Sequence, residues 1–167
     1  SDLINSIDRV SKDVVRVFLR LPPTASFKIL PGQYVDIIGP SHVKRSYSVA
    51  NHVTDNILEF HIRKVENGSF SRYWFDEAQI NDLLRLNGPL GTFFLRDIKG
   101  QDLVFLATGT VIAPIKAIIE SIKFLPPEEH PNSISVFWGG RTLDDFYFEP
   151  LADFKLFRYV PALSRPD

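Results

Sequence analysis

Short runs of alternating apolar and polar residues fill the first hundred positions of the chain. Residues 3–21 contain two such runs, and the second places Val15, Val17, Leu19 and Leu21 on one face. Further strand-like runs, separated by turns rich in Pro and Gly, lie at 35–38, 45–50, 57–63, 83–86 and 92–95. Short strands joined by such turns are typical of small antiparallel barrels. This part of the sequence therefore predicts a six-stranded antiparallel β-barrel.

The pattern changes after Lys99-Gly100. A continuous apolar strand is predicted at 102–107, a tight turn at Thr108-Gly109-Thr110, and a helix at 112–124. The apolar stripe of that helix comprises Ile115, Ile118, Ile119 and Ile122. Two more strands, at 134–138 and 154–160, complete the beginning of a parallel α/β sheet of the Rossmann-like kind. We expect two domains, 1–99 and 100–167, of which the second is short enough to be truncated.

Composition narrows the class of partner. Lys and Arg number 19 against 20 Asp and Glu, and no basic run occurs, so neither nucleic acid nor a membrane surface is an expected partner. No signal-peptide pattern opens the chain and no apolar run could span a bilayer, so a cytoplasmic protein is expected. Cysteine is absent, which excludes disulfides, thiolate zinc sites and an iron-sulfur cluster within this span. No metal site is expected.

One strand carries the first candidate site. In Arg45-Ser46-Tyr47-Ser48, alternation places Arg45 and Tyr47 on one face, with the backbone around Ser48 beside them. A guanidinium can take a phosphate, a phenol ring can stack on a flat heterocycle, and a serine can bond its polar edge. A flavin nucleotide combines these three parts. The alternative is an ordinary strand with a solvated polar face.

A second candidate follows in Gly68-Ser69-Phe70-Ser71. This segment leads into a short helix predicted at 72–75, with Asn67 or Ser69 as its N-cap. Free N–H groups at a helix start can receive a pyrophosphate. The alternative is a plain capped helix that fills one end of the barrel.

These motifs, read together, resemble the ferredoxin-NADP reductase superfamily. The further landmarks, in order along the chain, are Pro31-Gly32-Gln33-Tyr34, Gly88-Pro89-Leu90-Gly91, Thr108-Gly109-Thr110-Val111-Ile112-Ala113-Pro114 and Phe137-Trp138-Gly139-Gly140-Arg141. The likeness is greatest to the bacterial branch of oxygenase reductases and of the reductases that serve dideoxysugar synthesis, such as CDP-6-deoxy-glucoseen reductase. The resemblance covers nearly the whole chain.

The resemblance implies an NAD(P)H-dependent flavoprotein reductase. Its cofactor would be FAD, by family habit, rather than FMN, and an iron-sulfur domain or protein would accept single electrons. Arg45 would pair with a flavin phosphate, Tyr47 would contact the ring or the ribityl chain, and Ser48 would lie near the reactive flavin nitrogen as the one catalytic candidate. The other implied cofactor- and nucleotide-binding residues are Ser46, His61, Ile62, Arg63, Gly68, Ser69, Phe70, Ser71, Thr108, Gly109, Thr110, Pro114, Arg141 and Arg165. His61, Ile62 and Arg63 would act largely through their backbone, with a plain surface-strand role as the alternative for His61.

Two departures from the family pattern bear on function. Val111 replaces the second glycine of the family's Thr-Gly-Thr-Gly turn, where a branched side chain could crowd the nucleotide or strain the turn. The family's later cysteine-glycine-proline segment and C-terminal strand do not follow Ser164-Arg165.

The choice between NADH and NADPH depends on charged residues near the end of the chain. Asp144 and Asp145 would repel a 2'-phosphate and so favour NADH over NADPH, whereas Arg141 and Arg165 would attract a 2'-phosphate. The rival hypotheses are a non-catalytic flavin-binding module with an impaired nucleotide site, and a structural barrel without cofactor.

Overall fold

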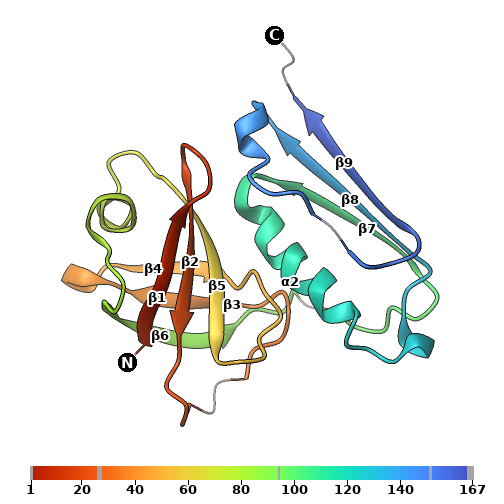
Figure 1. Cartoon of the computed structure of the whole chain (residues 1–167), viewed down its shortest axis with the longest axis horizontal. Coiled ribbons are helices and arrows are strands. Elements are labelled where there is room, and N and C mark those ends of the chain that lie inside the picture. The colour runs from red at the N-terminus through yellow and green to blue at the C-terminus, as the bar shows by residue number, and fades with distance from the viewer. Residues whose placement is uncertain (1, 26–27, 94, 151, 165–167) are drawn as a thin grey trace.

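Two β-sheets lie side by side in the computed structural model, which describes residues 2–25, 28–93, 95–150 and 152–164 (Figure 1). One sheet is antiparallel and has the order β4-β3-β6-β1-β2-β5, and the other is parallel with the order β7-β8-β9. The antiparallel strands are β1 (Asp2–Arg9), β2 (Val14–Arg20), β3 (Tyr34–Ile38), β4 (Lys44–Ser48), β5 (Ile57–Arg63) and β6 (Leu83–Leu90). The parallel strands are β7 (Asp102–Thr108), β8 (Ser133–Gly140) and β9 (Phe157–Leu163).

The antiparallel sheet curls around an apolar core. Residues that alternate along the strands fill it, and Val15, Val17, Leu19 and Leu21 are all buried as the two-residue period predicts. The two edge strands approach each other where the rings of Tyr47 on β4 and Phe60 on β5 meet edge to face, with centroids 6.5 Å apart. The predicted six-stranded barrel is confirmed.

Some boundaries in this half differ from those predicted. The expected strand at 92–95 does not form in its described residues. Instead β6 continues through the Asn87-Gly88-Pro89 corner to Leu90, and its Asn87 and Leu90 pair with β3. The expected helix at 72–75 begins earlier, as α1 (Ser69–Arg72), and continues as a π-helical turn at Tyr73–Glu77. Its N-cap is Gly68, which has no side chain, rather than Asn67 or Ser69.

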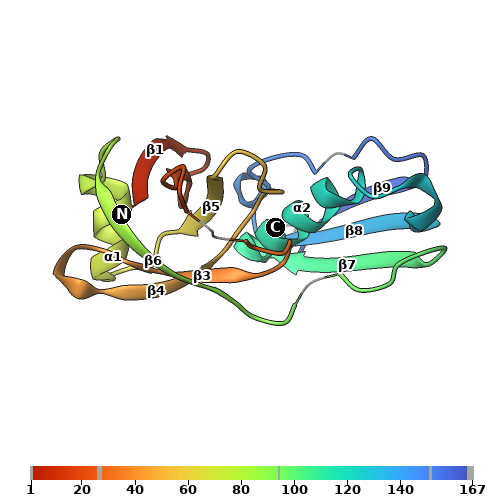
Figure 2. The same ribbon diagram turned by 90° about the horizontal axis from the view of Figure 1, so that it is seen from below.

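The parallel sheet carries helix α2 (Ile112–Ile122) on the face that Figure 2 shows uppermost. All four residues of the predicted stripe are buried, together with Ile112, Ala113, Pro114 and Ala117. Four of these helix residues form a second apolar core with three residues of β8: Ile112, Ile115, Ile119 and Ile122 with Ile134, Val136 and Trp138. The helix ends two residues before the predicted 124, and the third strand begins at Phe157 rather than at 154. Short 3₁₀ turns occupy Pro40–His42, Gly109–Val111, Pro127–Glu129 and Leu143–Asp145.

Helix α2 also faces the barrel, so it lies between β5 and the parallel sheet (Figure 1). A second link joins the two halves where the backbone N–H of Lys12, in the β1–β2 turn, donates to Asp144 Oδ2 at 3.0 Å. Within the described part of the chain, no helix has the length and apolar character that crossing a bilayer requires. The domain boundary near residue 99 stays a prediction.

Candidate cofactor and nucleotide site

Strand β4 presents Arg45 and Tyr47 on the same face. Their partners on β3 are Ile37 and Val35, which are both fully buried, so this face is continuous with the barrel core. Arg45 is nevertheless exposed because β4 is an edge strand. Among the described residues, the only hydrogen-bond partner of its guanidinium is the carbonyl of Lys44, at 2.8 Å. Most of its guanidinium donors therefore point to solvent and can reach an anionic ligand.

Tyr47 is half-buried in an aromatic cluster. Its ring meets those of Phe60, Phe70 and Trp74 edge to face, and its hydroxyl accepts a hydrogen bond from Trp74 Nε1 at 3.3 Å. Burial raises the pKa of Tyr47 even though the bond from Trp74 and the charge of Arg45 oppose the shift. The phenol is therefore neutral, and its surroundings hold the ring in place.

The two serines of the motif lie on the other face of β4. Ser46 donates to Asp36 Oδ1 at 2.5 Å, and Ser48 stands opposite Tyr34 on β3. Ser48 is half-buried at the last position of β4, immediately before the chain crosses toward β5. It is therefore Ser48, and not Ser46, whose hydroxyl is left for a ligand at the open edge of the strand.

The Gly68-Ser69-Phe70-Ser71 segment divides between core and surface. Phe70 is 4% exposed in the barrel core, stacked on Trp74 with centroids 5.1 Å apart, and the Ser71 hydroxyl accepts the Val65 N–H at 2.7 Å. Only Gly68 and Ser69 remain accessible from outside. The segment thus serves as a core-filling helix, and any ligand contact must come from its first two residues.

These groups suit an anionic flavin nucleotide. Arg45 offers a cation with spare donors, Tyr47 and Ser48 lie at the open strand edge, and Gly68 and Ser69 begin a helix nearby. Each part of the nucleotide has a chemically matched group. The fit rests on residues that belong to the barrel half alone.

A separate cavity of about 640 Å³ opens at the carboxyl ends of β7 and β8. Its volume lies within the range of small-molecule sites, about 300–1,000 Å³, and its place is where open α/β sheets bind ligands. It brings together residues of both halves, which are Arg63, Thr108, Gly109, Thr110, Val111, Gly139, Gly140, Arg141, Asp145 and Ser164. Thr108, Gly109, Thr110 and Arg141 were expected in a nucleotide site, whereas Gly139 and Gly140 were recognised only as part of a family landmark. Ser164 belongs to the Ser-Arg pair that the family resemblance places near the adenosine.

Two glycines shape this cavity. Gly109 adopts φ +57°, and its carbonyl accepts the Nε1–H of buried Trp138 at 3.1 Å, which fixes the turn. At Gly140 a Cβ would lie 2.9 Å from the Cβ of Asp145, so only glycine lets the next loop approach. A Gly-Gly pair at the end of a buried parallel strand is the sequence signal for this second glycine.

Val111 does not strain the turn. Its backbone is helical, with φ −60° and ψ −18°, and its side chain is 55% exposed toward the cavity. The prediction that Val111 strains the turn is therefore wrong. The other predicted effect, crowding of a bound nucleotide by the Val111 side chain, stays a prediction.

Two other residues were expected in the nucleotide site. Pro114 is buried in the first turn of α2, where its missing N–H is tolerated, and does not line the cavity. Arg165 lies outside the described residues.

Arg63 reaches the cavity from β5. Its side chain, and not only its backbone, is involved, because the guanidinium lies 3.7 Å from Asp145 Oδ1. Partial burial works against ionisation of Asp145, but the N–H groups of Arg141 and Thr142 and the charge of Arg63 outweigh it and lower the pKa. Asp145 thus caps its own turn, while the carboxylate of Asp144 is bonded to Lys12.

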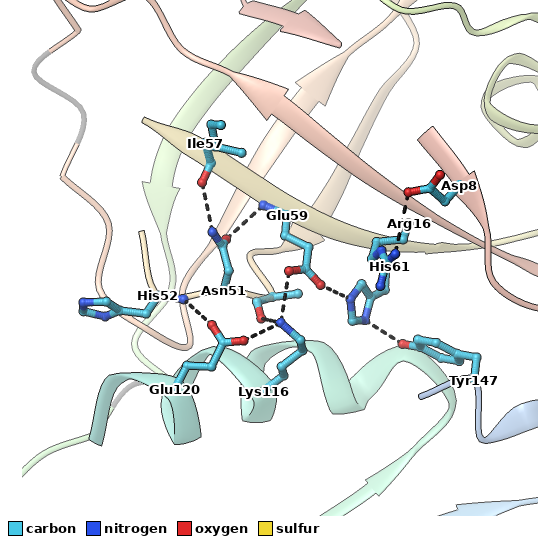
Figure 3. Close-up of polar contacts among 11 residues, drawn as sticks. Asp8, Arg16, Asn51, His52, Ile57, Glu59, His61, Lys116, Glu120 and Tyr147 are labelled. Carbon is cyan, nitrogen blue, oxygen red and sulfur yellow. Dashed lines mark hydrogen bonds and ion pairs between the residues drawn. The ribbon is translucent and has the colours of Figure 1, made fainter. Parts of the chain in front are cut away.

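The side chain of His61 lies in a polar network between the two halves (Figure 3). His61 is 5% exposed, so the alternative of a surface-strand residue is wrong. Its Nε2 lies 2.6 Å from Glu59 Oε2 and its Nδ1 2.7 Å from the Tyr147 hydroxyl. Ile62, its neighbour, points into the barrel core. The network also includes Lys116, which no sequence motif singled out.

Known proteins are similar to this chain in both sequence and fold. Residues 3–95 match the family described as oxidoreductase FAD-binding domain. The CDP-6-deoxy-L-threo-D-glycero-4-hexulose-3-dehydrase reductase of Yersinia pseudotuberculosis is 38% identical over 169 residues, covering 98% of this chain and 50% of the relative. Component C of the methane monooxygenase of Methylosinus trichosporium is 37% identical, covering 87% and 43%. The chain thus spans about half the length of these curated relatives.

A solved structure extends the comparison to cofactors. The ferredoxin NADP⁺ reductase of Neisseria gonorrhoeae, described with bound FAD and NADP, superposes with a TM-score of 0.79 at 25% identity, covering 99% of this chain and 68% of that one. The family match includes β4, β5 and α1, which carry the candidate flavin residues, and the structural match continues through the parallel sheet. The chain belongs to the FAD-binding oxidoreductases of the ferredoxin-NADP reductase type.

Proposed function

We propose that this chain is the flavin- and nucleotide-binding part of an NAD(P)H-dependent reductase, which passes electrons through FAD to an iron-sulfur protein or domain. Residues 1–99 would bind FAD and residues 100–167 the nicotinamide nucleotide. Relatives support the acceptor class: one is a ferredoxin–NAD(P)⁺ reductase component of a naphthalene dioxygenase system, 31% identical. A cytoplasmic location is part of the proposal.

The observation that carries the proposal is the composition of the 640 Å³ cavity. It joins the glycine-containing ends of two parallel strands to Arg63 of the FAD-binding region. A nucleotide held there would lie against the half of the molecule that holds the flavin. Electron transfer from one cofactor to the other requires this adjacency.

The residues of the chain act by binding and alignment. FAD, when bound, supplies the redox chemistry, because it accepts a hydride and releases electrons singly. Arg45 would neutralise the flavin phosphate, and Ser48 would donate a hydrogen bond near the ring nitrogen that reacts. Arg63 and Arg141 would hold the nucleotide phosphates, and the Gly109 turn, fixed by Trp138, would let them approach the backbone. No acid-base pair is required for this reaction.

NADH is the proposed donor, and the acidic residues of the 141–145 turn bear on this choice. The carboxylates of Asp144 and Asp145 are engaged by Lys12 and by the turn itself, although Asp145 still lines the cavity. Its negative charge would disfavour a 2'-phosphate. Parallel reduction assays with NADH and NADPH decide the preference.

The test of the function has two stages. The purified chain should show flavin absorbance, and a colourless chain that takes up no added FAD would leave the structural-barrel hypothesis standing. NADH added without oxygen should then bleach the flavin. A flavin that stays oxidised under saturating NADH would favour the non-catalytic module, for which the exposed Val111 side chain in the cavity is the specific argument.

A further inference from the structure

Lys116 joins the helix of the nucleotide half to the barrel. It lies one turn into α2, and its Nζ donates to the Ala50 carbonyl at 3.3 Å and to Glu59 Oε1 at 3.0 Å. Ala50 follows β4 by two residues, and Glu59 is in β5. One ammonium group therefore contacts both β5 and the segment that follows the candidate flavin strand β4 (Figure 3).

Glu120, one turn further along α2, makes the next contact. Its carboxylate accepts a bond from Lys116 through one oxygen and the backbone N–H of His52, at 3.1 Å, through the other. The segment that receives these bonds is itself fixed to β5, because Asn51 bonds the Ile57 carbonyl and the Glu59 N–H, both at 2.9 Å. The helix is thus attached to a rigid part of the barrel at two successive turns.

A third contact, from Tyr147, lies on the far side of Glu59. Burial lowers the pKa of His61, and although burial alone would raise that of Glu59, the bonds from His61 and Lys116 lower it. Neutral His61 must therefore donate from Nε2 to the Glu59 carboxylate and accept the Tyr147 O–H at Nδ1. The ring of half-buried Phe148, the next residue, also meets the His61 ring edge to face, so Tyr147 and Phe148 together tie this loop to β5.

Directional contacts of this kind fix an orientation. The side chains of Glu59 and Lys116 are 6% and 21% exposed, so water competes weakly with their bond. Directional hydrogen bonds at three points along the junction, from Glu120, Lys116 and Tyr147, restrict sliding of one half against the other. Apolar contacts alone, which have no direction, would allow such sliding.

We propose that Lys116, together with Glu59 and Glu120, is a positioning residue that aligns the nucleotide-binding turn with the flavin strand. The turn Gly109–Val111 leads directly into α2, and the segment bonded by Lys116 follows β4. This clamp of Lys116, Glu59 and Glu120 therefore connects the elements that carry the two sites. The expected effect of Lys116 on flavin reduction by NADH rests on the function proposed above. Its expected effect on the relative orientation of the two halves does not.

The relative orientation of the two halves can be measured with spin labels, because the chain has no cysteine of its own. Glu66 in the barrel half and Lys155 beyond α2 are both exposed, so Glu66→Cys and Lys155→Cys give two specific spin-label sites in an otherwise cysteine-free chain. In the FAD-loaded protein we expect one narrow distance distribution. Lys116→Met should broaden it at least twofold in width, Lys116→Arg should restore most of the narrow component, and Lys123→Met, on the exposed end of the same helix, should leave it unchanged.

The kinetic test separates positioning from binding. Lys116→Met should slow anaerobic flavin reduction at saturating NADH about tenfold, a loss of the size that small misalignments cause, while flavin retention and the NADH dissociation constant change less than twofold. Glu120→Gln, at a 36% exposed side chain, provides a milder variant with a smaller effect should Lys116→Met fold poorly.

The outcomes are distinct. An unchanged distance distribution in both Lys116→Met and Glu120→Gln overturns the clamp, whatever the kinetics. A broadened distribution with an unchanged reduction rate overturns its role in alignment. Should the parent protein not be reduced by NADH at all, the proposed function fails while the distance measurement still decides whether the clamp exists.

Discussion

The guanidinium of Arg63 lies 3.7 Å from the carboxylate of Asp145, across the junction between the barrel and the parallel sheet. Arg63 closes one wall of the nucleotide cavity, and a Cβ on Gly109 would stand 3.5 Å from its Nη1. A cation in this position faces the space that nucleotide phosphates would occupy. Under the proposed function, Arg63 would therefore contact the nucleotide, although it belongs to the FAD-binding region.

Arg63→Ala should therefore weaken NADH binding about tenfold, the effect of losing one charge-assisted hydrogen bond, while flavin retention stays within twofold. Titration of the FAD-loaded protein with NADH or NAD⁺ measures the first quantity, and absorbance after gel filtration measures the second. Lys64→Ala is the matched control, because Lys64 is the next residue and its ammonium lies over the Phe75 ring, away from the cavity. Equal losses in the two variants would contradict the assignment.

Arg45→Ala should reduce flavin retention about tenfold, because the exposed guanidinium would lose its phosphate contact while no intramolecular ion pair is broken. Arg141→Ala should leave flavin retention unchanged, since Arg141 lines the 640 Å³ cavity at the ends of β7 and β8 and not the flavin strand β4. Flavin fluorescence released by denaturation gives the bound fraction for both. Equal retention in the two variants would count against the placement of the flavin on β4.

The spacing of apolar residues along the sequence predicted much of the fold. The barrel core follows from strands such as 15–21, where every second residue is apolar, and the stripe of α2 follows from a spacing of three and four. Turn chemistry was less reliable. The strand expected at 92–95 is replaced by a longer β6, because Asn87-Gly88-Pro89 continues the pairing with β3 instead of ending it.

The contacts between the barrel and the parallel-sheet half could not be predicted from the sequence. In the strand predicted at 57–63, apolar and polar residues alternate, which is typical of one core-facing and one solvated face. Leu58 and Phe60 are buried in the core as this pattern indicates. Glu59 and His61 on the other face are buried instead, because α2 and Tyr147 pack over them from positions more than fifty residues away. A polar residue on a strand gives no local sign of which distant cation will cover it.

Val111→Gly tests the crowding of the nucleotide site. Removing the branched side chain from the cavity wall should improve NADH affinity severalfold if a ligand must approach the turn closely. The same change should lower the free energy of unfolding by about 0.5–1 kcal/mol, because the backbone at 111 is helical and glycine loses more entropy there. Val111→Ala serves as the control for backbone flexibility. An unchanged affinity in both variants would remove crowding as an explanation for weak nucleotide binding.

The buried His61 should make the stability of the chain depend on pH. Burial lowers the pKa of His61 below its ordinary 6.5, so between that lowered value and pH 6.5 the unfolded chain binds a proton that the folded chain does not. Stability should therefore fall as the pH drops below about 6.5, by at most about 1.4 kcal/mol per pH unit, and should level off below the folded pKa. Glu59, whose pKa is lowered from 4.5, adds a separate loss only at more acidic pH.

Urea unfolding at closely spaced pH values from 5 to 8 measures this slope. His61→Asn should flatten it between pH 6.5 and the folded pKa, because the group that takes up the proton on unfolding is gone. His42→Asn is the matched control: His42 is exposed and has φ +60°, a conformation that asparagine tolerates, so the slope should remain. The assignment of the slope to His61 fails if His61→Asn retains it or if His42→Asn abolishes it.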